Sequence, residues 1–587
     1  MFWKSFMPVT RTRPITRGPL SMVLMLSLSA PAWAASTKAP LDHQLQPAMS
    51  CEALRSFPYA GMKLTSIELI AAGSLSVPGI AEAMPEHCLV RGELNERVSP
   101  VDGKRYAIGF EMRLPSHWNG RFFYQANGGL DGRLVPAYGG QLGGGPDSNG
   151  LLKGFAVISS DAGHAMENGG KGVGAALFGL DPQARRDYGY NAVAQLTPMA
   201  RQLITGFYGY RPARSYLLGA SNGGRHAMVA AARDTGQYDG IVAGDPGFNL
   251  PQAAVAQVWG AQQFARVASL DAAGKPDLET SFTPAQLKWV AQAVLQRCDG
   301  LDGLKDGLIF DMAACQRHFD IQRDVASCQS GQTEHCLDEG RKRVLQRLFS
   351  GPHLGEQQLY SAMPWDSGID GQDWRDWKLK YSVGPRDAIA LGFVFMTPPV
   401  SPAVVNGEGT SLLDYALNFS LEQDAPRIYA SNGTYTEAAM TFMPPPQAAH
   451  MDHFIQRGGK LIVFHGNSDP VFSALDTVHW YQALSRNHGK ATADSVRLFL
   501  IPGMNHTRYG PATDQFDMLD AIVAWVEQGK APQRVIASAR GQGSLSPNAE
   551  IPADWSAQRS RPLCPYPQLA RYDGKGDPEQ AASFLCQ

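Results

Sequence analysis

Three residues that are far apart in the sequence have the side chains that nucleophilic catalysis requires: Ser221, Asp469 and His506. A serine hydroxyl is a weak nucleophile, so it needs a neighbouring base, and a histidine base needs a carboxylate that orients its ring. Ser221 lies in a Gly-x-Ser-x-Gly motif at residues 219–223. In a sharp turn between a strand and a helix, this motif exposes the serine hydroxyl at the edge of a sheet. These side chains together predict acyl transfer through a covalent intermediate on Ser221.

The sequence around each of these residues predicts the element that would position it. An apolar run at residues 216–218 precedes the serine motif, and the alanine-rich stretch after the motif is typical of a helix. The apolar runs 460–464 and 496–501 predict buried strands, and Asp469 and His506 lie on the loops that follow them. The chain order serine, aspartate, histidine is that of α/β-hydrolases, and open α/β sheets place their sites at the carboxyl ends of strands. We therefore predict an α/β fold of the α/β-hydrolase type.

A glycine-rich loop earlier in the chain is a candidate for the oxyanion hole. Residues 120–125 predict a strand that runs into Asn-Gly-Gly at residues 127–129. In an α/β-hydrolase, the loop after this strand supplies one backbone N–H to the oxyanion hole, and the residue after the nucleophile supplies the other. This assigns Gly129 and Asn222. The alternative interpretation of the glycines is an ordinary tight turn.

A long segment separates two of the predicted core strands. The strand at residues 240–244 is followed by the next core strand only at Lys460, whereas connections in an α/β unit usually take about 2–6 residues. We predict a catalytic core at residues 35–247 and 446–587, with an inserted lid domain at residues 248–445. Tryptophans in the second half of this insertion suit either a wall for aromatic substrates or the packing of the insertion itself.

The first 34 residues have the features of a signal peptide. Four basic residues within the first 17 precede a short apolar run and then Ala32-Trp33-Ala34, which predicts cleavage after Ala34. The apolar run is shorter than the roughly 20 residues that span a bilayer. The formal charge of −2, with 18% charged residues, gives no reason to expect a nucleic-acid or membrane partner. We expect a secreted or periplasmic monomer that acts on a small molecule.

The cysteines predict disulfides. The chain contains eight cysteines, all after the predicted signal peptide, and an even number in an exported chain favours disulfide pairing. Eight cysteines allow 105 pairings, but these lie in four couples that are local in sequence. The predicted pairs are Cys51–Cys88, Cys298–Cys315, Cys328–Cys336 and Cys564–Cys586. Zinc is not expected, because no Cys-x-x-Cys motif or histidine cluster accompanies them.

An aspartate loop at residues 298–308 carries Asp299, Asp302 and Asp306 among glycines. Carboxylates that converged there without a cation would repel one another, and calcium takes six to eight oxygen ligands that include backbone carbonyls. The spacing is not that of an EF-hand loop. From the residues alone, a calcium site and a solvated acidic turn both remain open.

Several further motifs resemble the tannase and feruloyl esterase family. The resemblance runs from about Cys51 to the C-terminus and within the family is greatest to the mono(2-hydroxyethyl) terephthalate hydrolases. Besides the aspartate loop, the motifs that carry it are residues 178–185, 238–244, 472–477, 502–506 and 561–567.

The resemblance implies a serine carboxylesterase for esters of aromatic acids, of terephthaloyl, feruloyl or galloyl type, with no organic cofactor. A secreted serine peptidase and a catalytically silent binding protein on the same fold are the alternatives. The implied triad and oxyanion residues are those assigned above. The residues implied to line the acyl pocket are Leu250, Trp377 and Phe472, and the implied structural Ca²⁺ ligands are the side chains of Asp299, Asp302 and Asp306 with the carbonyls of Leu304 and Leu308.

Two features depart from the family pattern. The family usually has a cysteine before the serine and another after the histidine, joined in a disulfide, but this chain has Ala220 and Thr507 there. The terephthalate enzymes also use an arginine in the lid to bind the free carboxylate of the substrate. The segment 381–387 does not clearly match theirs, and Arg386 is the candidate for this role.

Overall fold

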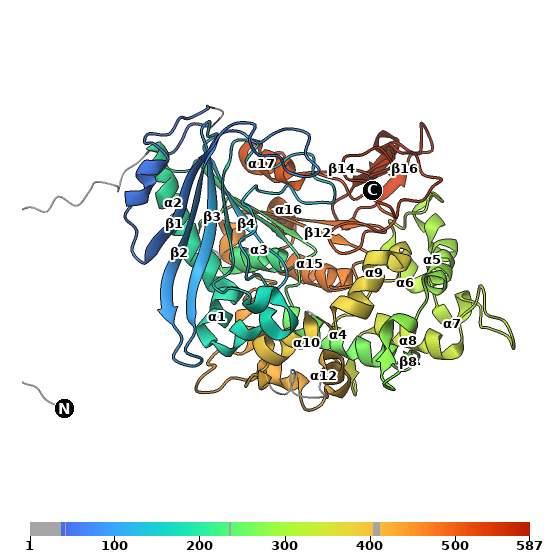
Figure 1. Ribbon diagram of the computed structural model, residues 1–587. Coiled ribbons are helices and arrows are strands. Elements are labelled where there is room, and N and C mark those ends of the chain that lie inside the picture. The colour runs from blue at the N-terminus through green and yellow to red at the C-terminus, as the bar shows by residue number, and fades with distance from the viewer. Residues whose placement is uncertain (1–36, 42, 234–235, 385, 403–410) are drawn as a thin grey trace, which may run out of the picture.

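The computed structural model describes residues 37–41, 43–233, 236–384, 386–402 and 411–587, and the predicted signal peptide lies outside them. A nine-stranded sheet in the order β1-β2-β3-β5-β4-β6-β7-β12-β13 organises the molecule (Figure 1). Its strands are β1 Met62–Ile70, β2 His87–Val98, β3 Arg105–Pro115, β4 Arg121–Ala126, β5 Ala156–Ser160, β6 Arg214–Ala220, β7 Gly240–Gly244, β12 Lys460–Gly466 and β13 Val496–Ile501.

The sheet is mixed. The pairing is antiparallel between β1 and β2, between β2 and β3, and between β3 and β5. From β5 onward, through β4, β6, β7 and β12 to β13, each strand is parallel to its neighbour. The parallel strands β5 and β7 are buried along their whole lengths, as expected for strands that are covered on both faces. The predicted α/β architecture is confirmed, because helices cover both faces of this sheet.

Alternating side chains of the parallel strands enter two separate cores, because neighbouring residues of a strand point to opposite faces. Leu217 and Ile241 belong to the core that contains helices α2 Ala192–Tyr208, α3 Asn222–Arg233 and α15 Ala474–His488. Leu218 and Val242 belong to the core under helix α17 Met518–Gln528. In Figure 1, α17 lies apart from α3 and α15, across the sheet. Strand β6 is therefore held from both sides, directly before Ser221.

The segment between β7 and β12 is mainly helical. None of its described strands joins the nine-stranded sheet, and its strands form two short hairpins. It is drawn in green to yellow at the lower right of the sheet in Figure 1. Its helices are α4 Leu250–Phe264, α5 Pro284–Cys298, α6 Met312–His318, α7 Ile321–Asp324, α8 Glu339–Ser350, α9 Gln372–Asp376, α10 Asp387–Ile389, α12 Leu412–Asn418, α13 Ala439–Phe442 and α14 Asp452–Gln456; its hairpins are β8 Ser269–Leu270 with β9 Pro276–Asp277, and β10 His353–Leu354 with β11 Gln357–Gln358.

The C-terminal segment packs against the aspartate loop of this insertion. Leu308 and Phe310 share a small core with Trp555 and Phe584. Two short antiparallel pairs build this part of the chain, next to the helices α5 and α6 in Figure 1. They are β14 Val535–Ser538 with β15 Ser560–Leu563, and β16 Ala570–Tyr572 with β17 Phe584–Cys586.

All four predicted disulfides are confirmed. They join Cys51 to Cys88, Cys298 to Cys315, Cys328 to Cys336 and Cys564 to Cys586. The second of these closes the aspartate loop by joining the end of α5 to α6. Among the described helices, none has both the length and the apolar character that crossing a membrane requires.

Candidate active site

Ser221 occupies a strained turn between β6 and α3. Its φ is 63°, in the left-handed region that residues with a side chain rarely adopt. The two glycines of the motif are required by close packing. A Cβ on Gly219 would lie 2.7 Å from the carbonyl oxygen of Ala126, and one on Gly223 would lie 2.4 Å from the same atom. The turn therefore forms only with glycine at both positions, and it raises the half-buried Ser221 side chain at the carboxyl edge of the sheet.

The structure brings Ser221, His506 and Asp469 together. His506 Nε2 lies 2.9 Å from Ser221 Oγ, and His506 Nδ1 lies 2.8 Å from Asp469 Oδ2. Because the Asp469 carboxylate can only accept, we place the proton on Nδ1, which leaves Nε2 free to accept from the serine hydroxyl. This is the geometry of a nucleophile, its base and the carboxylate that orients the base.

Four N–H groups surround the Asp469 carboxylate. Oδ1 accepts from the backbone N–H groups of Val471 at 2.7 Å and Phe472 at 3.2 Å, and Oδ2 accepts from His506. A second imidazole, that of His465, places Nε2 3.3 Å from Oδ2. Burial alone would raise the pKa of Asp469, but the His506 charge and the hydrogen bonds from both histidines hold that pKa well below its usual range.

His465 was not identified by the sequence analysis. It is fully buried at the end of β12, and its Nε2 faces the carbonyl oxygen of Phe472 at 3.2 Å as well as Asp469. Both groups accept, so Nε2 carries a proton, while Nδ1 contacts the Thr477 hydroxyl at 2.9 Å. The only signal in the sequence is its position four residues before Asp469, at the end of the same strand.

The residues around His465 do not fit a resident metal ion. Among the described residues, Asp245, His465 and Asp469 form the one group of three whose possible ligand atoms all lie within 4.8 Å of one another. The nitrogens of His465 and the carboxylate of Asp469 are, however, already used in hydrogen bonds. One oxygen of Asp245, Oδ2, has no hydrogen-bond partner among the described residues, and burial raises the pKa of Asp245 to about 7.

The loop that contains the predicted oxyanion residue Gly129 passes beside the serine. A Cβ on Gly128 would lie 3.5 Å from Ser221 Cβ, and both Gly128 and Gly129 are exposed. Gly129 has a φ of 66°, which favours glycine. Asn222, the other predicted oxyanion residue, is buried at the first position of α3. The structure thus places both predicted residues next to the nucleophile, and their catalytic role stays a prediction.

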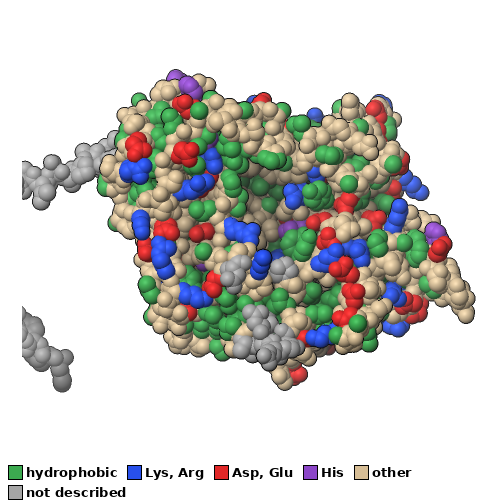
Figure 2. Space-filling view, viewed as in Figure 1, with side chains coloured by type: hydrophobic (Ala, Val, Ile, Leu, Met, Phe, Trp, Pro, Cys, Tyr) green, Lys and Arg blue, Asp and Glu red, His purple; other side chains and the backbone are tan. Residues whose placement is uncertain are grey.

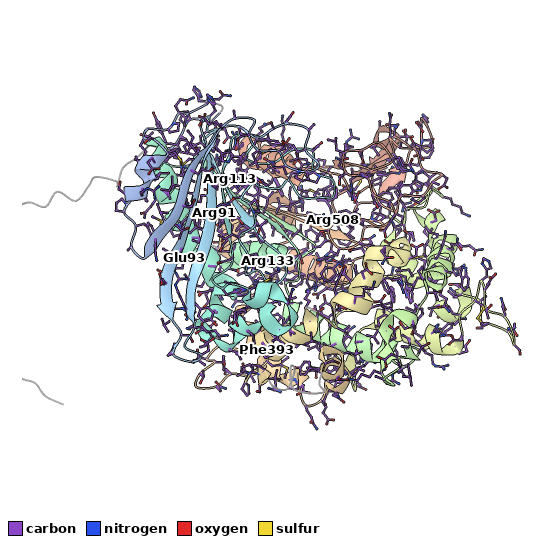
Figure 3. The ribbon with its side chains drawn as sticks, in the orientation of Figure 1. Arg91, Glu93, Arg113, Arg133, Phe393 and Arg508 are labelled. Atoms are coloured by element: carbon purple, nitrogen blue, oxygen red, sulfur yellow. A yellow bond between two sulfur atoms is a disulfide. The ribbon has the colours of Figure 1, made fainter. Side chains whose placement is uncertain are left out.

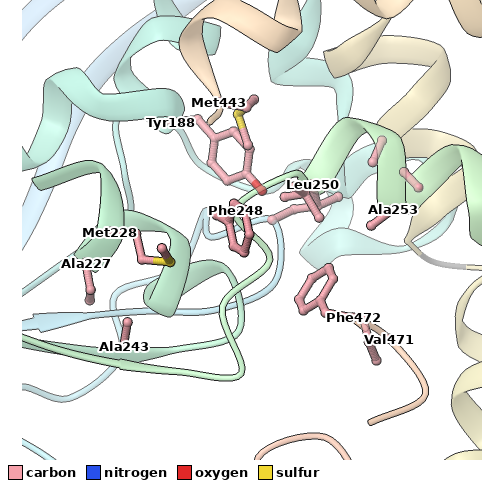
Figure 4. Close-up of a cluster of buried hydrophobic side chains, with 14 of the residues drawn as sticks. Tyr188, Ala227, Met228, Ala243, Phe248, Leu250, Ala253, Met443, Val471 and Phe472 are labelled. Atoms are coloured by element: carbon pink, nitrogen blue, oxygen red, sulfur yellow. The ribbon is translucent and has the colours of Figure 1, made fainter. Parts of the chain in front are cut away.

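Two of the three residues predicted to line the acyl pocket contact the ring of His506. Trp377 and Phe472 both contact the His506 ring edge-to-face, with ring centroids 5.3 Å and 5.5 Å from that of His506. Leu250, at the start of α4, lies between Tyr188 and Phe472 in Figure 4. These side chains come from three separate segments of the chain.

Arg386 contacts two of these three side chains. Its guanidinium carbon is 5.1 Å from the ring centroid of Trp377 and 5.1 Å from that of Phe472. Within the described part of the chain, the nearest carboxylate is that of Asp387, 3.7 Å from Nε, which is longer than a direct hydrogen bond. Nη1 is buried and has no hydrogen-bond partner among the described residues. Arg386 therefore has a donor available for a group that enters the pocket.

One face of the molecule is hollowed. Figure 2 shows a depression with hydrophobic side chains in its walls and basic side chains on its rim. Arg133 and Arg508, which Figure 3 labels, lie beside this depression. Leu134 and Val135, which follow Arg133, are exposed. The surroundings suit a substrate that has both an apolar ring and a negative charge.

The aspartate loop binds parts of its own backbone. Asp299 accepts from the N–H of Gly307 at 3.1 Å, and Asp302 accepts from that of Leu304 at 3.2 Å. Asp306 pairs with Arg561 at 2.6 Å and also accepts from the N–H of Leu308 at 3.1 Å.

The donor set of this loop fits a cation such as Ca²⁺. Burial and the nearby charges of Asp306 and Asp299 raise the pKa of Asp302 to about 7. Burial is the largest cause of this rise, the charges of Asp306 and Asp299 add to it, and Arg561 pairs with Asp306. A hard cation with carboxylate and carbonyl ligands would offset the remaining repulsion.

No disulfide ties the serine turn to the histidine loop, because all eight cysteines are paired elsewhere. Hydrogen bonds hold the loop instead. The Asn505 side chain donates to the carbonyl oxygens of Gly368 at 2.9 Å and Ser468 at 3.3 Å. Asn505 thereby connects the loop that carries His506 to the loop that carries Asp469 and, through Gly368, to the insertion.

Comparison with known proteins gives relatives of one kind. The sequence profile of the family described as tannase and feruloyl esterase matches residues 88–587. The chain is 38% identical to mono(2-hydroxyethyl) terephthalate hydrolase of Piscinibacter sakaiensis, over 92% of this chain and 91% of that protein. It is 26% identical to a probable feruloyl esterase B-1 of Neosartorya fischeri, over 81% of this chain and 82% of that protein.

Solved structures with the same fold are also esterases. Feruloyl esterase B from Aspergillus oryzae matches with a TM-score of 0.70 at 23% identity, over 92% of this chain and 99% of that one. Tannin acyl hydrolase from Aspergillus niger matches with a TM-score of 0.62 at 17% identity, over 91% of this chain and 92% of that one. At these identities the likeness establishes the fold alone.

Proposed function

The chain belongs to the tannase and feruloyl esterase family and is a carboxylic ester hydrolase, and on this premise we propose that it is an exported serine esterase that cleaves esters of aromatic acids through an acyl-enzyme. The observation that carries the proposal is the continuous path of hydrogen bonds from Ser221 Oγ through His506 to Asp469. A peptidase would use the same three side chains, so the substrate decides between the two classes.

In the first step, His506 Nε2 takes the proton of Ser221 as Oγ attacks the ester carbonyl. Asp469 holds the imidazole in place and stabilises the charge that the imidazole gains. The backbone N–H groups of Gly129 and Asn222 stabilise the negative charge on the former carbonyl oxygen. His506 then gives the proton to the departing alcohol, and the aromatic acyl group stays on Ser221.

In the second step, water replaces the alcohol. His506 removes a proton from that water as the water oxygen attacks the acyl carbonyl, and the proton returns to Ser221 when the aromatic acid leaves. Trp377 and Phe472 flank His506, so an aromatic acyl group can pack against both rings while its carbonyl lies at Ser221.

Labelling tests the nucleophile and the reaction class. A fluorophosphonate should label the wild-type protein at Ser221 stoichiometrically, and aryl and alkyl esters of terephthalate, ferulate and gallate should be hydrolysed. A peptide anilide should not. Labelling with peptide cleavage and no ester cleavage would support the peptidase, and no labelling at all would contradict both.

Arg386 favours an acyl group with a free carboxylate. Trp377 and Phe472 each contact both the His506 ring and the Arg386 guanidinium, so the guanidinium lies about one aromatic ring away from the base. Its buried Nη1 would gain a charge-assisted partner from the para-carboxylate of a terephthalate monoester. We therefore propose terephthalate monoesters as the preferred substrates among the three acyl types.

Arg386→Ala is expected to lower kcat/KM for a terephthalate monoester by about 10–100-fold, because hydrogen bonds to charged groups contribute about 1.5–3 kcal/mol. The matched substrate, in which the free carboxylate is a methyl ester, should lose far less. Arg133→Ala serves as the control, because Arg133 lies on the rim (Figure 3). Equal losses on the charged and the neutral substrate would contradict the assignment.

We also propose that the aspartate loop binds a structural Ca²⁺ through Asp299, Asp302 and Asp306, with the carbonyls of Leu304 and Leu308. The donor set and the raised pKa of Asp302 support it. The ion would supply positive charge that holds the loop between α5 and the C-terminal segment together. No step of ester cleavage involves it.

Ca²⁺ at a hundredfold excess over its Kd is expected to stabilise the fold by about 2.7 kcal/mol, because only the native loop gathers these ligands. The measurement is thermal unfolding in EDTA and in Ca²⁺, together with calorimetric titration. In the Asp302→Asn variant the Ca²⁺ effect should disappear. Identical melting curves for the wild type in EDTA and Ca²⁺, with no heat of binding, would contradict the proposal.

An exported location and a lid function for the insertion complete the proposal. Four disulfides favour an oxidising compartment, in agreement with the predicted signal peptide. Trp377 of the insertion contacts the His506 ring, and Arg386 of the insertion contacts Phe472, as residues of a substrate-covering lid would.

A further inference from the structure

The loop that passes beside Ser221 is held by buried side chains at successive residues. The Tyr188 hydroxyl donates to the carbonyl oxygen of Gly129 at 3.1 Å. His164 Nε2 lies 2.8 Å from the carbonyl oxygen of Leu130, which can only accept. Tyr188 and His164 are both buried. The carbonyl oxygens of Gly129 and Leu130 therefore each have a hydrogen-bond partner on a buried side chain.

The next residue of the loop, Asp131, is bonded to the helix that begins at the nucleophile. Its Oδ2 accepts from Asn222 Nδ2 at 2.8 Å and from His226 Nε2 at 3.0 Å. Asp131 is 6% exposed, Asn222 1% and His226 4%. Asp131 has a φ of 53°, in the left-handed region that few residues with a side chain adopt and that aspartate tolerates better than most.

Arg225 closes these contacts into a ring. Its Nε donates to Asn222 Oδ1 at 2.6 Å, and its Nη2 donates to the carbonyl oxygen of Tyr188 at 2.9 Å. Hydrogen bonds and short stretches of backbone thus lead from Gly129 through Tyr188, Arg225 and Asn222 to Asp131 and back to the loop. Fully satisfied buried networks of this kind fix one geometry.

Arg225 and Asp131 bring groups of opposite charge to this ring. Arg225 is completely buried, and burial lowers its pKa to about 10. Burial raises the pKa of Asp131, and the charge of Arg225 opposes that rise. His226 Nδ1 lies 3.2 Å from Arg225 Nη2, which can only donate, so Nδ1 accepts and Nε2 carries the proton that Asp131 accepts.

We propose that Asp131 and the Asn222 side chain form a clasp that sets the spacing between the two backbone donors of the oxyanion hole. Asn222 then has two roles, because its backbone N–H is one donor and its side chain holds the loop that carries the other. Asp131 is a positioning residue that touches no substrate. The inference rests on the proposed serine esterase function and adds to it the residues that position the site.

The clasp predicts a selective loss of transition-state stabilisation. Asp131→Ala should lower kcat for an aromatic ester by about 10²-fold, because a displacement of about 1 Å at a donor has that effect. Binding of 4-carboxyphenylboronic acid, whose tetrahedral adduct on Ser221 places an oxygen in the oxyanion hole, should weaken in parallel. Binding of terephthalic acid, a planar product, should stay unchanged. Asp131→Asn keeps an acceptor for Asn222 and should recover most of kcat.

The control is Glu527→Gln at the opposite end of the sheet. Glu527 is a half-buried carboxylate, and it accepts from Arg121 and from the Tyr216 hydroxyl at 2.7 Å each. This variant should lower the melting temperature without a selective loss of boronic acid binding. If Asp131→Ala does not fold, Asn222→Ala, which keeps its backbone N–H, provides the same comparison.

A parallel loss of boronic acid and terephthalic acid binding in the Asp131 or Asn222 variant would contradict the clasp, and so would an unchanged kcat. A wild-type protein that a fluorophosphonate does not label contradicts the proposed function itself. The two failures are thus distinguishable.

Discussion

Ser221→Ala is expected to lower kcat for an aromatic ester by about 10⁶-fold, the loss that follows removal of a serine nucleophile from a complete triad. Among the described residues, the only hydrogen bond to the side chain that the change removes is the 2.9 Å contact with His506 Nε2. The backbone at Ser221 is strained, and alanine meets the same strain, so the melting temperature should change little. The measurement is kcat on a terephthalate monoester, with circular dichroism as the check on folding.

The variant should also bind terephthalic acid as the wild type does, because the acyl pocket is intact. A loss of only tenfold would mean that another group attacks the ester. A loss that is accompanied by unfolding would mean that Ser221 supports the fold, and this would contradict the expected unchanged melting temperature.

Asp469→Asn is expected to lower kcat by about 10⁴-fold, because the imidazole then adopts the wrong tautomer. The hydrogen bonds that Asp469 accepts give a second reason to expect a large loss. The Asp469 carboxylate accepts from Val471, Phe472, His465 and His506, whereas an asparagine has one acceptor oxygen and one amide group. At least one of these donors would face the amide nitrogen and lose its partner.

The pKa of Asp469 has a consequence for stability at low pH. This pKa is depressed in the folded protein, so the ionised carboxylate stabilises the fold above the unfolded value of about 3.9. That contribution is lost only as pH falls through the lower folded pKa. The ellipticity of the wild type should therefore stay constant between neutral pH and about pH 4, as far as Asp469 determines it. A stability in Asp469→Asn that follows the same pH dependence as the wild type below about pH 4 would contradict this expectation.

The main elements and the triad could be predicted from the sequence because their signals are local. Each strand that precedes a triad residue is a short apolar run, and the glycines at 219 and 223 identify the turn that exposes Ser221. The sequence-local spacing of the cysteines was also sufficient to pair them correctly.

The groups around the triad could not be predicted, because their partners come from distant segments. His465 directly follows the apolar run 460–464, and only the fold shows its Nε2 facing Asp469. Arg225 has no local signal, since Tyr188 and Gly189, to which it donates, lie on another helix. Charged side chains that are satisfied by backbone carbonyls leave no pattern in a sequence.

One helix departs from a general rule. A proline inside a helix usually kinks or breaks it, but α2 runs unbroken through Pro198 from Ala192 to Tyr208. The carbonyl that loses its partner belongs to Ala194, four residues earlier, which is exposed. Water can bond that carbonyl, so the helix continues.

The adjacency of β7 and β12 has a consequence for how this architecture can diversify. These strands pair from Gly240 with Lys460 to Gly244 with Phe464, although about two hundred residues intervene between them. The insertion therefore begins and ends at two adjacent strands of the sheet. An insertion of different sequence or length would begin and end at the same two strands, and it would change the residues around the substrate while Ser221, Asp469 and His506 stay in place. Specificity for new esters can therefore evolve through changes in the insertion alone.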